Sequence, residues 1–187
     1  MVNDAWGLTA GTAAFERARA LEAVSARRRF EGLVARHSPR LRGVAFAMLG
    51  AADAVDDVLQ DSFARAYPKL PRRFESERHE AAWLYKIVFR CCLNELRRRR
   101  RRPEVSVLAT EYLSEPTDEP GADFAVASVL ADLPIEQRAV VLLVDLVGFD
   151  YEATARILRI PRGTVASRLN AARTRLRVAL EEGETDV

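Results

Sequence analysis

Apolar residues recur at helical spacing through the first half of the chain and predict three helices between positions 30 and 102. The first ends at Gly50 and is expected to break near Pro39, because proline inside a helix removes a backbone hydrogen bond. The second is expected over 54–67, with an inward face of Val55, Val58, Leu59 and Phe63. A loop over 69–81 should precede the third helix, which runs from 82 to about 102.

Helical spacing returns in the last third of the chain. Pro134 suits the first turn of a helix that is apolar nearly all round, Gly148 suits its C-cap, and Asp150 can cap the next helix. A short turn over 159–161 leads into a final helix with one apolar face, formed by Val165, Leu169, Ala172 and Leu176. Because no strand-like alternation is present, we predict an all-α fold of two helical bundles joined by a flexible linker.

Composition divides the chain into five segments. An alanine-rich extension over 1–25 includes a possible helix from position 13 and has no assigned role. The first domain is expected over 26–102 and the second over 128–180, with an acidic tail over 181–187. Between them, residues 103–127 hold three prolines, six acids and no base, which is the composition of a linker.

Charge is distributed unevenly, although the net charge is only +2. Residues 156–180 contain seven arginines and no acid, within a helix, a short turn and a second helix. On the second helix, arginines flank an outward face of Ser167, Asn170, Ala171 and Thr174. Such a face fits the recognition helix of a helix-turn-helix motif, with asparagine reading adenine and arginine reading guanine. The alternative is a helical hairpin with a solvated basic face.

A second basic segment spans 84–102 and ends in six consecutive arginines. Here aromatic and cationic residues interleave: Trp83, Tyr85, Lys86, Phe89 and Arg90. Aromatic rings can stack on unpaired bases while cations hold phosphates, as single-strand binding requires. Equally, the aromatic residues can form a core while the arginines are merely solvated.

The helix over 54–67 has a different, acidic face. Asp57, Gln60 and Asp61 share its exposed side, with Asp53 one turn earlier. This face suits a protein partner, although a solvated surface is the simpler interpretation of the helix alone.

No constellation of catalytic residues is present, so we do not expect an enzyme, a cofactor or a metal site. His37 and His79 have no nucleophile at motif spacing, and the sequence has no glycine-rich phosphate loop. Cys91 and Cys92 are adjacent and suit small apolar helix positions, with a redox switch as the alternative. No apolar run could span a bilayer and no secretory signal is seen, so we expect a cytoplasmic protein.

Three stretches together resemble the extracytoplasmic-function (ECF) sigma factors of the sigma-70 family. They are DAVDDVLQDSFARAY at 53–67, FESERHEAAWLYKIVFRCCLNELRRRR at 74–100, and the stretch from LADLPIEQR to AARTRLR at 130–177. The resemblance implies that the chain binds core RNA polymerase at its clamp and flap, together with promoter DNA and an anti-sigma factor. It further implies that the linker threads toward the RNA exit path, where its acids mimic nucleic acid.

The resemblance also implies three sets of site residues. The residues implied in core polymerase binding are Asp56, Asp57, Gln60 and Asp61. Recognition and melting of the −10 element fall to Phe74, His79, Trp83, Tyr85, Lys86, Arg90, Asn94 and Arg97. Recognition of the −35 element falls to Arg162, Thr164, Ser167, Arg168, Asn170, Ala171, Arg173 and Arg175.

Four positions depart from the family pattern. Glu80 replaces a usual aromatic residue, Cys91 a common asparagine, Thr154 an isoleucine, and Arg159 the usual turn glycine. Two other functions stay open at this point. A sigma-like decoy would sequester an anti-sigma factor without binding promoters, and a helix-turn-helix regulator would act without polymerase.

Overall fold

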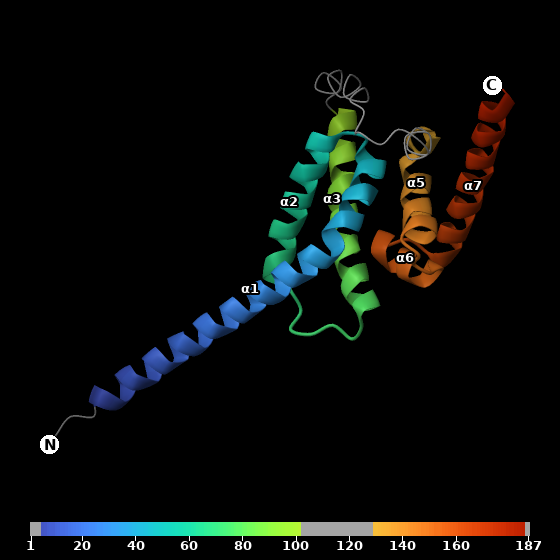
Figure 1. Ribbon diagram of the computed structural model, residues 1–187. Coiled ribbons are helices and arrows are strands. Elements are labelled where there is room, and N and C mark those ends of the chain that lie inside the picture. The colour runs from blue at the N-terminus through green and yellow to red at the C-terminus, as the bar shows by residue number, and fades with distance from the viewer. Residues whose placement is uncertain (1–4, 102–128, 186–187) are drawn as a thin grey trace.

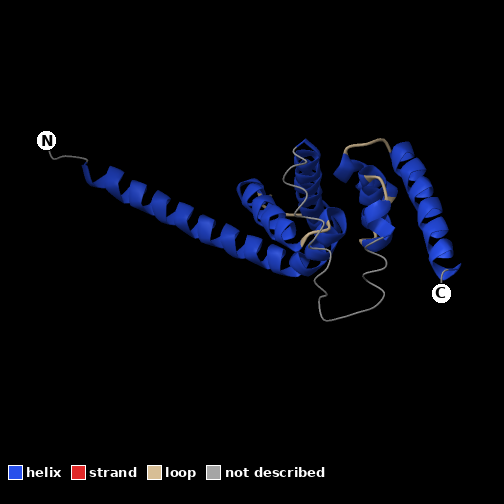
Figure 2. Ribbon diagram, turned by 90° about the horizontal axis from the view of Figure 1, so that it is seen from above, coloured by secondary structure: helices blue, strands red, loops and turns tan. Residues whose placement is uncertain are grey.

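The computed structural model describes residues 5–101 and 129–185, and within these ranges the chain forms helices and no strand (Figures 1 and 2). The prediction of an all-α fold with two bundles is confirmed. The expected linker over 103–127 and the last two residues of the expected tail lie outside the described residues. The elements are α1 (Ala5–Leu49), α2 (Ala52–Ala66), η1 (Tyr67–Lys69), α3 (Glu77–Arg101), α5 (Ile135–Val141), η5 (Leu142–Leu146), α6 (Tyr151–Leu158) and α7 (Arg162–Thr185).

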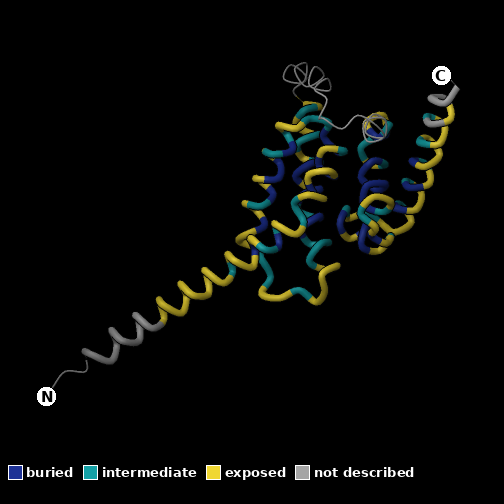
Figure 3. Tube along the Cα trace, viewed as in Figure 1, coloured by how far each residue is buried: buried dark blue, intermediate teal, exposed yellow. Residues whose placement is uncertain are grey.

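The first bundle consists of the C-terminal half of α1 together with α2 and α3. Its core contains the predicted inward residues Val55, Val58 and Leu59, each at most 6% exposed, with Phe63 partly buried against them. The N-terminal half of α1 projects from this bundle and its described side chains are largely exposed (Figure 3).

The predicted break at Pro39 is wrong, because α1 continues through it. The lost backbone hydrogen bond is offset by burial on both sides of the proline, where Leu33 is 1% and Leu41 0% exposed. Figure 1 shows the helix axis turning between the projecting half and the part that enters the bundle. One helix therefore contains the expected extension and the start of the first domain.

The start of α3 at Glu77 corrects the expected loop over 69–81, which is five residues too long. Ser76 caps the helix, since its hydroxyl accepts a hydrogen bond from the backbone N–H of His79 at 3.1 Å. Acidic residues then fill the first turn, at Glu77 and Glu80. A serine followed by acids is a recognisable N-terminal signal, and it could have placed this boundary correctly.

The second bundle is formed by α5, η5, α6 and α7, and its expected caps are present. Gly148 follows the π-helical turn η5 with φ +86°, and the carboxylate of Asp150 accepts from the N–H of Ala153 at 2.7 Å. Pro134 lies at the N-cap, one position before the helical turn predicted for it. Arg159 occupies the left-handed region at φ 58°, which costs a non-glycine residue about 1 kcal/mol.

Two further boundaries differ from the sequence pattern. Residues 181–185, expected to belong to a tail, continue α7. The helix expected after Pro134 changes from α to π geometry at Leu142, because backbone hydrogen bonding there shifts by one residue.

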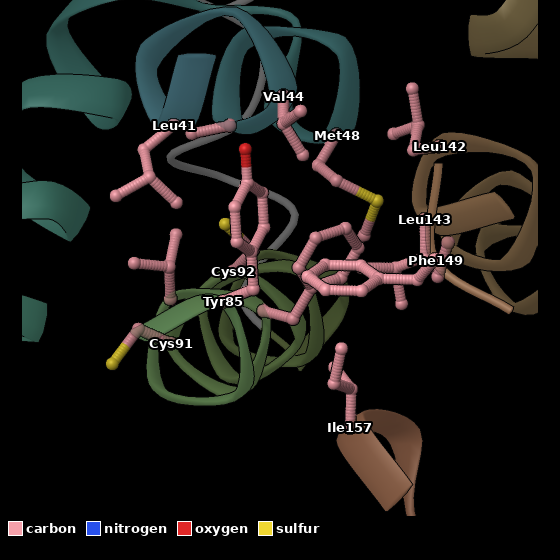
Figure 4. Packing of buried hydrophobic residues seen from close by; sticks show 14 of the residues in the cluster. Leu41, Val44, Met48, Tyr85, Cys91, Cys92, Leu142, Leu143, Phe149 and Ile157 are labelled. Atoms are coloured by element: carbon pink, nitrogen blue, oxygen red, sulfur yellow. The ribbon is translucent and has the colours of Figure 1, made fainter. Parts of the chain in front are cut away.

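The two bundles pack against each other, chiefly through α3 and α6. The rings of Tyr85 and Phe149 meet edge to face at 5.4 Å between centroids. Figure 4 shows Met48 from α1 beside Phe149, Leu142 and Leu143 of the second bundle. The buried guanidinium of Arg138 also crosses the interface and donates to the carbonyl oxygen of Met48 at 2.9 Å.

Candidate nucleic-acid interfaces and the acidic face of α2

The outward face of α7 has the small, exposed character that the sequence predicted. Ser167, Asn170 and Thr174 are exposed, while Ala171 and Thr164 are half-buried. The hydroxyl of Thr174 donates to the carbonyl oxygen of Asn170 at 3.0 Å, so it is satisfied within the helix. In contrast, the Asn170 side chain has no hydrogen-bond partner among the described residues and can pair with an external group.

The arginines around this face divide into two kinds. Arg162 and Arg175 are exposed and Arg168 is half-buried, and none of them forms an ion pair within the described parts of the chain. Arg173 instead makes a bidentate contact with Asp145 of η5, at 2.5 and 3.1 Å. Its positive charge is therefore partly neutralised, which weakens its attraction for phosphate.

Basic and amide groups from the last turns of α3 surround an open pocket of about 570 Å³. Its lining is Asn94, Arg97, Arg98 and Arg101. Glu95 holds Arg98 at 2.8 Å and Arg99 at 3.0 Å, so one carboxylate organises two arginines. Lys86 and Arg90 lie on the same helix, half-buried and exposed respectively. The pocket offers several cations to a polyanion such as a phosphate backbone.

Tyr85 does not lie at the surface with the other predicted −10 residues. Its side chain is 1% exposed, and Figure 4 shows its hydroxyl pointing toward α1 near Leu41 and Val44. That hydroxyl has no hydrogen-bond partner among the described residues, and burial raises the pKa of Tyr85. The alternating aromatic pattern did not distinguish Tyr85 from its exposed neighbours, because the α3 face that carries Tyr85 packs against both α1 and Phe149 of the second bundle.

Phe74, His79 and Trp83 do come together where the loop meets α3. The Phe74 ring centroid lies 5.5 Å from that of Trp83 and 6.1 Å from that of His79. Phe74 and Trp83 are half-buried and His79 is exposed, so part of this aromatic group faces solvent. It forms the surface on which an unpaired base could stack.

The acidic face of α2 is present as predicted. Asp57, Gln60 and Asp61 are exposed, while Asp56 is half-buried and forms an ion pair with Arg42 of α1. A shallow pocket of about 310 Å³ lies beside them, lined by Ser38, Pro39, Arg42, Asp56, Leu59, Gln60 and Phe63. The surface therefore combines carboxylates, an amide and apolar groups, as a protein-binding surface does.

The two cysteines occupy the bundle core. Cys91 is 5% and Cys92 1% exposed, and burial raises the pKa of the Cys92 thiol to about 12. A thiol so rarely ionised is a poor nucleophile, which opposes a redox role for Cys92. Within residues 5–101 and 129–185, no cluster of three potential metal ligands occurs, and no helix has the length and apolar character to cross a bilayer.

Sequence reasoning missed the polar contacts between distant segments, among them two that involve the first turn of α3. Glu80 accepts hydrogen bonds from Arg36 and His37 of α1, and Arg78 forms an ion pair with Asp150 at 2.9 Å. Only the unusual acid at position 80 gave a local signal for the first contact. The second depends on how the bundles pack, so no local pattern could have revealed it.

Comparisons with known proteins agree on both halves of the chain. The Sigma-70 region 2 family profile matches residues 33–102, and the Sigma-70, region 4 profile matches residues 123–176. The ECF RNA polymerase sigma factor SigM of Mycobacterium tuberculosis is 36% identical over 150 residues, covering 79% of this chain and 74% of SigM. The ECF RNA polymerase sigma factor EcfG of Rhodopseudomonas palustris is 33% identical over 145 residues, covering 76% and 80% of the two chains.

Two solved structures share the arrangement of helices. The sigma factor RpoE of Bartonella quintana, in complex with the anti-sigma factor NepR, has a TM-score of 0.64 and 27% identity, covering 81% of this chain and 96% of RpoE. CnrH, in complex with the cytosolic domain of CnrY, has a TM-score of 0.60 and 30% identity, covering 86% and 95% of the two chains.

Proposed function

Because this chain belongs to the ECF sigma factors of the sigma-70 family, we propose a division of labour between its two bundles. The first bundle, within residues 26–102, binds core RNA polymerase and opens the −10 element. The second, within residues 128–180, reads the −35 element as duplex DNA. Both activities serve one function, which is to direct core polymerase to specific promoters and initiate transcription there.

Core binding is assigned to the acidic face of α2. Asp57, Gln60 and Asp61 are exposed on one side of the helix, and the adjoining pocket adds apolar contact area. The family implies the polymerase clamp as the partner of this helix and the flap as a partner of the second bundle.

Opening of the −10 element is assigned to the loop before α3 and to α3 itself. Phe74, His79 and Trp83 supply the aromatic surface for unpaired bases. Cations and amides along the helix, namely Lys86, Arg90, Asn94 and Arg97, hold the backbone of the separated strand. Tyr85 supports this surface from the core and does not touch DNA.

Recognition of the −35 element is assigned to the first turns of α7. Asn170 and Arg168 act as base readers, and Ser167 and Ala171 are short enough to let the helix approach base edges. Arg162, Thr164 and Arg175 contribute backbone contacts, with a smaller share from Arg173 because of its ion pair with Asp145.

An anti-sigma factor is the proposed regulatory partner. The RpoE structure contains such a factor, and its likeness to this chain extends over both bundles. A partner that contacts both bundles would control access to both promoter elements at once.

The observation that carries the proposal is the occurrence, in one chain, of a sigma-70 region 2 bundle and a region 4 helix-turn-helix, both with exposed basic surfaces. Transcript start sites mapped after overexpression would supply a promoter for a purified system. Addition of the protein to core polymerase should then give transcripts from that promoter. A decoy or a polymerase-independent regulator would give none, and that result would refute the proposal.

A further inference from the structure

Glu80 is an acidic side chain enclosed by the bundle rather than exposed at its surface. Its side chain is only 14% exposed, and one carboxylate oxygen, Oε1, serves two groups from α1. Arg36 Nη2 donates to it at 2.7 Å, and His37 Nε2 lies 3.2 Å away. These partners are 44 and 43 residues away in sequence, so the cluster joins the start of α3 to the middle of α1.

The cluster keeps Glu80 ionised in spite of its enclosure. Burial by itself would raise the pKa of this carboxyl, but the hydrogen bonds from Arg36 and His37 outweigh it and the pKa is lowered. Loss of the carboxylate would leave two α1 groups without their acceptor, and α3 without this attachment to α1.

A second contact attaches the loop that precedes α3 to α1. Arg29 Nη2 donates to the carbonyl oxygen of Pro71 at 2.8 Å. The segment from Pro71 to Glu80 is thus fixed to one helix at both ends, and Phe74 lies between the two attachments. The aromatic group of Phe74, His79 and Trp83 therefore depends on α1 for its position.

We propose that Glu80 is a positioning residue for −10 opening, which holds the Phe74–Trp83 aromatic pair in place by joining α3 to Arg36 and His37. The inference rests on the proposed function, since it assigns the aromatic pair to unpaired bases. Glu80 itself faces α1 and does not contact DNA.

The direct test is Glu80→Gln, which keeps the shape of the side chain and removes its charge. With the variant holoenzyme, the −10 thymines should become reactive to permanganate about tenfold more slowly. This is the effect expected when a hydrogen bond to a charged group is lost. Affinity for core polymerase should stay within about twofold, because α2 is unchanged. Glu136→Gln is the matched control: Glu136 is exposed on α5, is not among the residues assigned to DNA or polymerase, and its replacement should leave opening unchanged.

A double-mutant cycle separates positioning from general damage. Arg36→Gln should slow opening in the same direction, and the Arg36→Gln/Glu80→Gln variant should be less impaired than the two single effects combined, because both act through one contact. In a Trp6→Phe background, the fluorescence of Trp83 should shift in Glu80→Gln and not in Glu136→Gln. If Glu80→Gln does not fold, Arg36→Gln alone tests the proposal, through the rate of −10 opening and the fluorescence of Trp83.

The outcomes also distinguish this inference from the proposed function. If the wild-type holoenzyme opens no promoter, the proposed function fails. If it opens the promoter and Glu80→Gln does so at the same rate, only the role of Glu80 fails. Equal loss of core binding and opening would likewise overturn that role, since it would indicate damage to the whole bundle.

Discussion

At the scale of single residues, the structure separates side chains that the sequence pattern had grouped together. Tyr85 and Trp83 belong to one run of aromatic and basic residues, yet Tyr85 is buried and Trp83 reaches the surface. Arg173 and Arg175 both lie on α7 beside its outward face, yet only Arg173 is paired with a carboxylate among the described residues. Each difference gives a distinct expectation for a substitution.

We expect Tyr85→Phe to preserve −10 opening and to keep or increase stability. Its buried hydroxyl has no partner among the described residues, so its removal relieves desolvation at no loss of a hydrogen bond. The gain should be up to about 1 kcal/mol, which corresponds to a melting temperature about 2–4 °C higher for a chain of this size. Thermal unfolding measures it, and a marked loss of stability would show that the hydroxyl is satisfied after all.

We expect Arg175→Ala and Arg173→Ala to differ in the salt dependence of −35 binding. Removal of Arg175 should flatten the slope of log K against log salt by about one unit. The reason is that the protein loses one phosphate contact, made by an arginine with no ion pair among the described residues. Removal of Arg173 should change the slope by less, because Asp145 already neutralises part of its charge. Binding titrations of −35 duplex at several salt concentrations provide the comparison, and equal slopes would contradict it.

At the scale of elements, local signals located the helices and several of their ends, and burial overrode the local signal at Pro39. Asp150, Gly148 and Gly50 act at the positions that their residue types indicate. Pro39 does not end α1, because α1 buries apolar residues against the bundle on both sides of the proline. The α2 pattern placed Asp57, Gln60 and Asp61 on one exposed face, as the structure has them.

We expect the Asp57→Arg/Asp61→Arg variant to lose co-purification with core polymerase while its helical circular dichroism is unchanged. Both side chains are exposed, so reversal of their charges alters the surface and not the core. The matched control is Glu16→Arg/Glu152→Arg, which makes the same change in net charge at exposed positions on other helices. Wild-type affinity in the α2 variant, or an equal loss in the control, would exclude α2 as the polymerase contact.

At the scale of the whole molecule, the two bundles form one continuous core. The contact includes the Tyr85–Phe149 pair, the Arg78–Asp150 ion pair and the buried Arg138. Among the described residues, Arg138 has only backbone carbonyl oxygens as hydrogen-bond acceptors, at Met48, Ala131 and Leu133, and burial lowers its pKa. No carboxylate among the described residues accepts a hydrogen bond from this buried cation, so it recovers its hydration when the bundles part, which favours separation.

We expect the bundles to separate when the protein acts at a promoter. Their names place the −35 and −10 elements about 25 base pairs apart, or about 85 Å along the duplex at about 3.4 Å per base pair. This is more than twice the length of the 25-residue helix α3, which is about 38 Å, so packed bundles are not expected to reach both. Energy transfer between dyes at Lys69→Cys and Val178→Cys should fall on addition of core polymerase and promoter, while a Glu31→Cys/Lys69→Cys pair within the first bundle should not change. The buried Cys91 and Cys92 should react little with the dyes. Unchanged transfer in an active complex would show that the bundles stay together.

The sequence by itself determined which segments are helical, the caps at Gly50, Gly148 and Asp150, the apolar face of α7 and the two basic segments, because these depend on residues within a few turns of one another. Its motifs also indicated the sigma-70 family, since they occur in the order and spacing of regions 2 and 4. Only the tertiary structure decided that α1 passes through Pro39, that Tyr85 is buried and that Arg173 is paired with Asp145. It alone joined Glu80 to Arg36 and His37. These features depend on contacts between segments far apart in the chain, where burial and charge pairing outweigh local preference.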